Sequence, residues 1–138
     1  MDALSNLNWL HVLVAAIAYY AVGAIWYSFL FQKPWIRFHK VDVNHPDSKK
    51  GVGAIMFAGF ILTFLITSGL AILIQRTGAN GGAASGLKLG LTTGLLFSAA
   101  AISMTYLYLK KPAGLHLIDG LFHVVGQVIA AVILCVWQ

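Results

Sequence analysis

The sequence predicts an all-α integral membrane protein, a bundle of four antiparallel transmembrane helices. Of its 138 residues, 59% are hydrophobic and 9% are charged, which is too apolar for an ordinary soluble domain. Four stretches also reach the roughly 20 apolar residues needed to cross a bilayer. These stretches are residues 9–31, 51–74, 84–109 and 115–137. Because the connections are short, we expect a single four-span membrane domain over residues 1–138.

The basic residues lie between the predicted spans and give the expected orientation. Five of the nine Lys and Arg residues lie within residues 32–50 and two at 110–111, whereas only Arg76 and Lys88 flank the second connection. Basic connections stay on the cytoplasmic side of a membrane. We therefore expect the first and third connections in the cytoplasm and both termini outside. The net charge of +5 then indicates the lipid bilayer, and not nucleic acid, as the partner.

The first span, residues 9–31, places small and hydroxyl-bearing residues on one helical face: Tyr20, Gly23, Ala24 and Tyr27. Small residues let helix backbones approach closely, and buried tyrosine hydroxyls need hydrogen-bond partners. This face is expected to pack against another span. In the connection that follows, Pro34 suits a first helical position, and the apolar residues Trp35, Phe38 and Val41 recur every three residues. A short interfacial helix is therefore predicted near residues 33–41.

The third span carries small residues at every fourth position: Gly82, Gly86, Gly90, Gly94 and Ser98. Without a hydrophobic force between helices in lipid, close contact at small residues is a main source of helix association. Four residues turn an α-helix by about 400°, so the repeat drifts about 40° per step and forms a slanted groove. This groove is expected to pack against a neighbouring span or against another copy of the chain.

The last span carries the polar pattern on which a function could depend. His116, Asp119, His123 and Gln127 fall within about 80° of arc on a helix, and we call these four residues the polar stripe. Ionisable groups inside a membrane are costly and usually face a bundle interior or a water path. The stripe, together with Tyr27 on the first span, is interpreted either as a proton relay or binding site, or as a helix anchor in which His123 satisfies Asp119.

Metal binding and catalysis receive little support from these residues. His116 and His123 are separated by about 10 Å along a helix axis, so they do not easily share one ion. Asp119 with His123 would supply only two ligands. No metalloprotease, nucleophile-elbow or phosphate-loop motif is present. We therefore predict no catalytic residue, no metal and no cofactor, and an enzyme is the least supported class.

Several motifs resemble those of a family of small bacterial and fungal membrane proteins, domain of unknown function 1761. They are Asn8-Trp9-Leu10-His11-Val12, Gly23-Ala24-Ile25-Trp26-Tyr27-Ser28, Lys33-Pro34-Trp35, Ile118-Asp119-Gly120 and Phe122-His123, together with the glycine-spaced third span. The chain departs from the family pattern at Phe29, where proline is common, and at Phe122, where tyrosine is frequent. The resemblance implies a four-span protein, expected in a bacterial inner membrane, and no established activity.

Two functions remain as expectations. The first is transport or permeation of protons or a small solute along the polar stripe, in a homo-oligomer, because four short helices enclose little volume alone. The second is an accessory or scaffolding subunit that docks partner helices through the glycine groove of the third span. A cavity that reaches Asp119 and His123 would discriminate between them, since a scaffold needs none.

Overall fold

The computed structural model describes residues 7–30, 52–78 and 81–137. All the regular secondary structure in this part of the chain is helical, and it contains four helices that are long and apolar enough to cross a membrane. They cover residues 9–28, 53–77, 83–108 and 113–136. The four predicted spans are therefore confirmed as helices, each with ends within one turn of the expected positions. The predicted interfacial helix at 33–41 lies outside the described residues.

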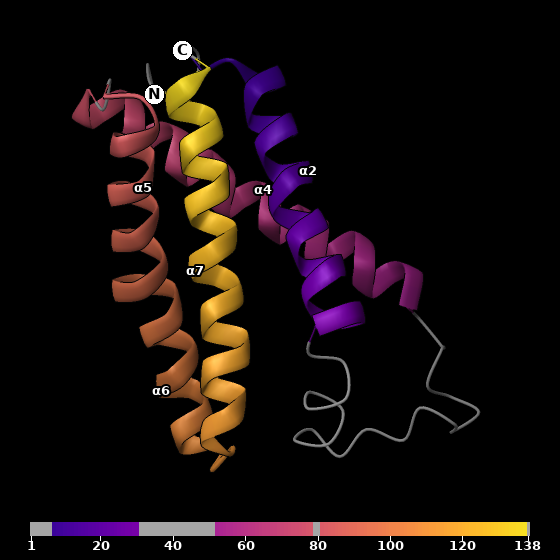
Figure 1. Cartoon of the computed structure of the whole chain (residues 1–138). Helices are drawn as coiled ribbons and strands as arrows, with labels where there is room; N and C mark the ends of the chain where they lie inside the picture. Colours follow the sequence, from indigo (N-terminus) through magenta and orange to yellow (C-terminus); the bar gives the residue numbers. More distant parts are fainter. Residues whose placement is uncertain (1–6, 31–51, 79–80, 138) are drawn as a thin grey trace.

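The central helix is α7 (Ala113–Val136), drawn in orange to yellow in Figure 1. The third span runs antiparallel beside it and consists of three consecutive segments. These are α5 (Ala83–Leu91), the π-helix η2 (Thr92–Ala99) and α6 (Ala100–Tyr108). Half of the α7 residues are buried, against fewer than a fifth in the third span. The polar stripe therefore belongs to the helix that most of the bundle surrounds.

Two further helices complete the surroundings of α7. The helix α2 (Trp9–Ile25) continues into the π-helix η1 (Trp26–Leu30), and it packs against α7. The helix α4 (Val52–Thr77) contacts both α2 and α7 and crosses them obliquely (Figure 1). Helix α2 begins after Asn8, whose side-chain oxygen accepts a hydrogen bond of 3.1 Å from the Leu10 backbone nitrogen. This is the usual role of an asparagine N-cap.

The glycine groove packs against α7 within the same chain. A Cβ atom added at Gly90 would lie 2.7 Å from the backbone nitrogen of Val128. Gly86 and Gly94 meet the α7 backbone in the same way, at 2.5 Å and 2.7 Å from the nearest Cα atoms. Real Cβ atoms do not come this close to backbone, so glycine is required at all three positions for the two helices to approach as they do.

Gly82 departs from the expected packing role. No atom lies within 4 Å of the position that its Cβ would occupy. Its φ of +66° instead belongs to the region that glycine adopts at little cost. Gly82 precedes the first residue of α5, so it shapes the start of the third span and takes no part in the contact with α7.

The π-helix η2 explains how a four-residue repeat stays on one side of the third span. A π-helix closes its hydrogen bonds from i to i+5 and so holds more residues per turn than an α-helix. Each step of four residues therefore drifts less in η2 than it would in a regular helix. Ser98 and Tyr106, which continue the spacing, both contact α7 by hydrogen bonds.

The apolar core lies in the half of the bundle nearest the two ends of the chain, between α2, α4 and α7 (Figure 1). Its buried members are small or branched apolar residues, with one tyrosine: Val12, Ala15, Tyr19, Leu70, Ala71, Ile74, Ala130, Leu134 and Cys135. The polar stripe begins where this core ends. Tyr19 belongs to both regions, because its ring is fully buried and its hydroxyl reaches the stripe.

Candidate functional site

The carboxylate of Asp119 is the centre of the candidate site. Asp119 is only 6% exposed, and both of its oxygen atoms accept hydrogen bonds. Tyr27 donates to Oδ1 and Tyr106 donates to Oδ2, each at 2.5 Å. Burial of a charged group is costly unless hydrogen bonds compensate it, and these two tyrosines from different helices provide that compensation. The contact with Tyr27 joins α7 to η1, which continues the first span.

His123 and Gln127 form a second part of the site, one and two turns further along α7. The hydroxyl of Tyr19 lies 2.5 Å from Nδ1 of His123. Gln127 donates a hydrogen bond of 2.5 Å to the hydroxyl of Ser98. The Tyr19 hydroxyl also interacts electrostatically with the side chain of Gln127, so these two hydrogen-bonded pairs belong to one region of the site.

Two contacts hold the surrounding elements in place. The indole nitrogen of Trp26 donates a hydrogen bond of 3.0 Å to the carbonyl of Ile118, which ties η1 to the residue preceding Asp119. His116 contributes a ring contact with Tyr106, at a centroid distance of 5.7 Å. His116 therefore contacts Tyr106, one of the two hydrogen-bond donors to Asp119. The other three stripe residues, Asp119, His123 and Gln127, make hydrogen bonds to side chains of other helices.

A cavity of about 420 Å³ lies beside the site, between α2, α4 and α7. Two members of the site, Tyr27 and His123, line it. The rest of the lining is mostly apolar, with hydroxyl groups from Tyr20, Ser28 and Thr63. Its size falls within the range of about 300–1,000 Å³ that is usual for small-molecule sites. Met56 is 54% exposed and also lines the cavity, so the cavity opens along α4.

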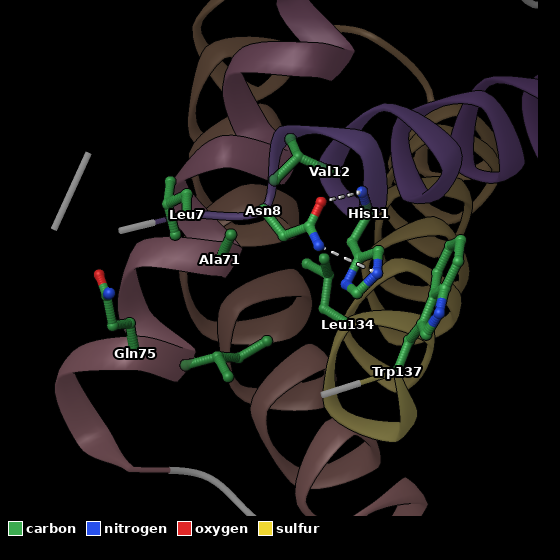
Figure 2. A pocket seen from close by; sticks show the side chains of 9 residues that line it. Leu7, Asn8, His11, Val12, Ala71, Gln75, Leu134 and Trp137 are labelled. Atoms are coloured by element: carbon green, nitrogen blue, oxygen red, sulfur yellow. Dashed lines mark hydrogen bonds between the residues drawn. The ribbon is translucent and has the colours of Figure 1, made fainter. Parts of the chain in front are cut away.

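A second cavity, of about 300 Å³, lies at the other end of the bundle. Figure 2 shows Asn8 and His11 in it, with Trp137 beside the imidazole. The amide nitrogen of Asn8 lies 3.2 Å from Nε2 of His11, and the rings of His11 and Trp137 stack at 3.9 Å. His11 lines this second cavity, and none of Asp119, His123 and Gln127 does. The fully buried residues Ala15, Leu70 and Ala130 occupy the core between the two cavities.

Comparison with known proteins places the chain in a family. A family model described as "Protein of unknown function (DUF1761)" matches residues 10–135. The chain belongs to the DUF1761 family. No curated protein and no solved structure matches it. The match extends from α2 to α7, so this DUF1761 protein carries the site and the cavity beside it within the family region. Leu7, Asn8 and Trp137, which line the second cavity, lie outside the matched residues.

Two members of the site in this DUF1761 protein, Tyr19 and Tyr106, were not among the residues predicted from sequence. Tyr19 follows Val12 by seven residues and precedes Gly23 by four, a spacing that places all three on one helical face. This spacing is the signal that would have identified Tyr19. Tyr106 follows Ser98 by eight residues and so continues the four-residue repeat of the third span, but on a regular α-helix it would lie about 80° further around the axis.

The chemistry available to this DUF1761 protein is hydrogen bonding and proton exchange. In the described part of the chain, no group of three or more His, Cys, Asp and Glu side chains lies close enough to hold a metal ion. The site instead combines a carboxylate, an imidazole and three tyrosine hydroxyls. Carboxylates and imidazoles inside a bundle exchange protons in pumps and transporters, and hydroxyl groups can donate and accept at once.

Proposed function

We propose that this protein is an integral membrane transporter that moves protons or a small solute through a site on α7. The observation that carries the proposal is the cavity of about 420 Å³ that Tyr27 and His123 line. Tyr27 is bonded to the Asp119 carboxylate and His123 to Tyr19. A solute in this cavity would therefore be separated from the buried Asp119 carboxylate only by the side chain of Tyr27. A scaffolding subunit has no need of such a cavity.

The apolar core between the two cavities also favours transport over a permanently open pore. Ala15, Leu70 and Ala130 place apolar side chains between the His11 cavity and the Tyr19 hydroxyl. The buried hydroxyl of Thr67, which lies in the same region of α4, donates its hydrogen to the carbonyl of Thr63. A transporter requires such a barrier, because an uninterrupted water path would dissipate the gradient. We propose that the site opens to one side of the membrane at a time, through movement of α4 against α2 and α7.

The scaffolding alternative has less support. It requires the glycine groove to be free for a partner helix, whereas Gly86, Gly90 and Gly94 lie against the backbone of α7. A partner that docked at these glycines would have to displace the central helix. We further propose that the protein lies in a bacterial inner membrane with both termini outside. We also propose a homo-oligomer in which copies of the chain contact one another through the exposed face of the third span.

Transport can be tested with purified protein in liposomes that contain a pH-sensitive dye. We expect the wild-type protein to accelerate proton entry along an imposed gradient, and Asp119→Asn to reduce the rate to that of empty liposomes. Lys88→Gln is the matched control, because it also removes one charge, at an exposed position on the third span. A melting curve of each variant accompanies the assay.

The outcomes separate transport from anchoring. If Asp119→Asn melts like the wild type and has lost proton entry, the carboxylate takes part in transport. If Asp119→Asn melts early and the wild type moves neither protons nor solutes under any tested gradient, the transport proposal is wrong and the scaffolding subunit is favoured.

A further inference from the structure

Three of the hydroxyl groups that line the cavity between α2, α4 and α7 already donate their hydrogens within the protein. Tyr20 donates to the carbonyl of Met56 and Thr63 donates to the carbonyl of Gly59, each at 2.9 Å. Tyr27 donates to the carboxylate of Asp119. A hydroxyl has one hydrogen and two lone pairs. These three groups can therefore meet a ligand only as hydrogen-bond acceptors, and the ligand has to supply the hydrogen.

Aromatic rings surround the same space. Tyr20, Tyr27 and Phe122 all line the cavity, and the rings of Tyr27 and Phe122 meet edge to face at a centroid distance of 5.4 Å. The faces of aromatic rings attract cations, ammonium groups among them. A cavity that combines acceptor oxygens with aromatic rings favours a positively charged donor over a neutral or negative group.

The remaining residues of the lining indicate that the ligand has an apolar part. Gly23, Ala24, Leu62, Ile66 and Met56 contribute only apolar surface, which favours burial of a hydrocarbon group. The described lining contains no Lys or Arg that would repel a cation. The volume of about 420 Å³ limits the ligand to a small molecule.

From these contacts we infer that the cavity binds a small hydrophobic amine in its protonated, ammonium form, with the ammonium group at the oxygens of Tyr20, Tyr27 and Thr63. This inference rests on the proposed function, because it names the solute class of the same site. The ammonium group donates to the acceptor oxygens, while the hydrocarbon part lies against Phe122 and the apolar residues of α4.

Three probes with the same apolar body and different polar groups test the inference: 2-phenylethylammonium, 2-phenylethanol and phenylacetate. Binding to the purified full chain in detergent is measured by titration calorimetry, with empty micelles subtracted. We expect the ammonium probe to bind most tightly and the carboxylate most weakly. Equal affinities for the three probes, or the tightest binding for phenylacetate, would overturn the inference.

Variants locate the binding. Tyr20→Phe and Thr63→Val each keep the shape of the lining and remove one acceptor, so each should weaken the ammonium probe by about three- to ten-fold. Gly59→Leu should abolish binding, because the new side chain enters the cavity. Tyr108→Phe is the control, at a position that is 81% exposed and outside the cavity. Ammonium binding that survives Gly59→Leu in a folded protein would place the ligand elsewhere and overturn the inference.

The binding assay needs no transport, so the two proposals fail separately. If the ammonium probe binds as expected but liposomes move neither protons nor the probe, the inferred site stands and the transport proposal falls. If protons move in an Asp119-dependent way and the ammonium probe does not bind, the transport proposal stands and the inference falls.

Discussion

Gln127 donates a hydrogen bond of 2.5 Å to Ser98, and this contact joins the polar stripe of α7 to the small-residue repeat of the third span. The two patterns are separate in the sequence, yet they form the two sides of one interface. Gln127 is 1% exposed, so its amide depends on partners within the protein. The interface is therefore held both by close backbone packing and by a buried polar contact.

Ser98→Ala is expected to lower the free energy of unfolding by about 1–3 kcal/mol, because it removes a partner from a buried amide. Adding Gln127→Met should recover part of this loss, since replacing both partners by apolar groups is often nearly neutral. A double-mutant cycle, measured by unfolding in detergent, gives the coupling. Strictly additive losses would contradict the pairing.

Gly90→Leu should destabilise the protein by about 1–3 kcal/mol or more, because overpacking forces the backbones of α5 and α7 apart. The control is Gly69→Leu on α4, where no atom lies within 4 Å of the added Cβ. Melting curves of the two variants are compared with the wild type. Equal melting temperatures for Gly90→Leu and Gly69→Leu would show that the third span does not pack on α7 as described.

Gly126→Ala should displace the ring of Tyr19, since the added Cβ would lie 2.6 Å from Cδ1 of that ring. Tyr19 is fully buried and its ring has no space to move into. We expect lower stability together with loss of the contact between Tyr19 and His123. Gly53→Ala, at an open position on α4, serves as the reference. A Gly126→Ala protein as stable as Gly53→Ala would be inconsistent with this packing.

Tyr27→Phe and Tyr106→Phe should each cost about 1 kcal/mol, the usual size of a side-chain hydrogen bond between membrane helices. Tyr108→Phe, on the same helix as Tyr106 but largely exposed, should cost nothing measurable. The losses should shrink when Asp119→Asn is already present, because the shared acceptor is altered. Unchanged losses in the Asn background would rule out Asp119 as the partner.

The orientation predicts which connections react with a membrane-impermeant thiol reagent in intact cells. In a Cys135→Ser background, Thr77→Cys should be labelled from outside, whereas Ser48→Cys and Lys111→Cys should be labelled only after the membrane is opened. The prediction rests on the distribution of basic residues. Strong labelling of Ser48→Cys in intact cells would reverse the orientation.

The helices could be predicted from sequence because hydrophobic length alone determines them. The same holds for the contact of Asp119 with Tyr27, since both residues lie at one depth when neighbouring spans run in opposite directions. The partner of the glycine groove could not be predicted, because a slanted row of small residues fits any helix at the right angle. Only the structure identifies α7 as that partner.

Tyr19 and Tyr106 show why the rest of the site was missed. Tyr19 and Tyr20 are adjacent and each shares a helical face with Gly23, so the spacing of Tyr19 is a weak reason to prefer it for the α7 side. Tyr106 reaches Asp119 from the far end of a span that contains a π-helix. A regular α-helix, assumed throughout the sequence analysis, would rotate Tyr106 away from that position.

The π-helix η2 makes the winding of the third span part of the site. One residue corresponds to about 100° of rotation on an α-helix. If the segment Thr92–Ala99 kept its length but closed as a regular α-helix, everything after it would turn about the helix axis. Gly86 and Gly90 would still contact α7, while the Tyr106 hydroxyl would leave Asp119. A homologue of the same length without the π-helix would share the fold and be unable to complete the same carboxylate site.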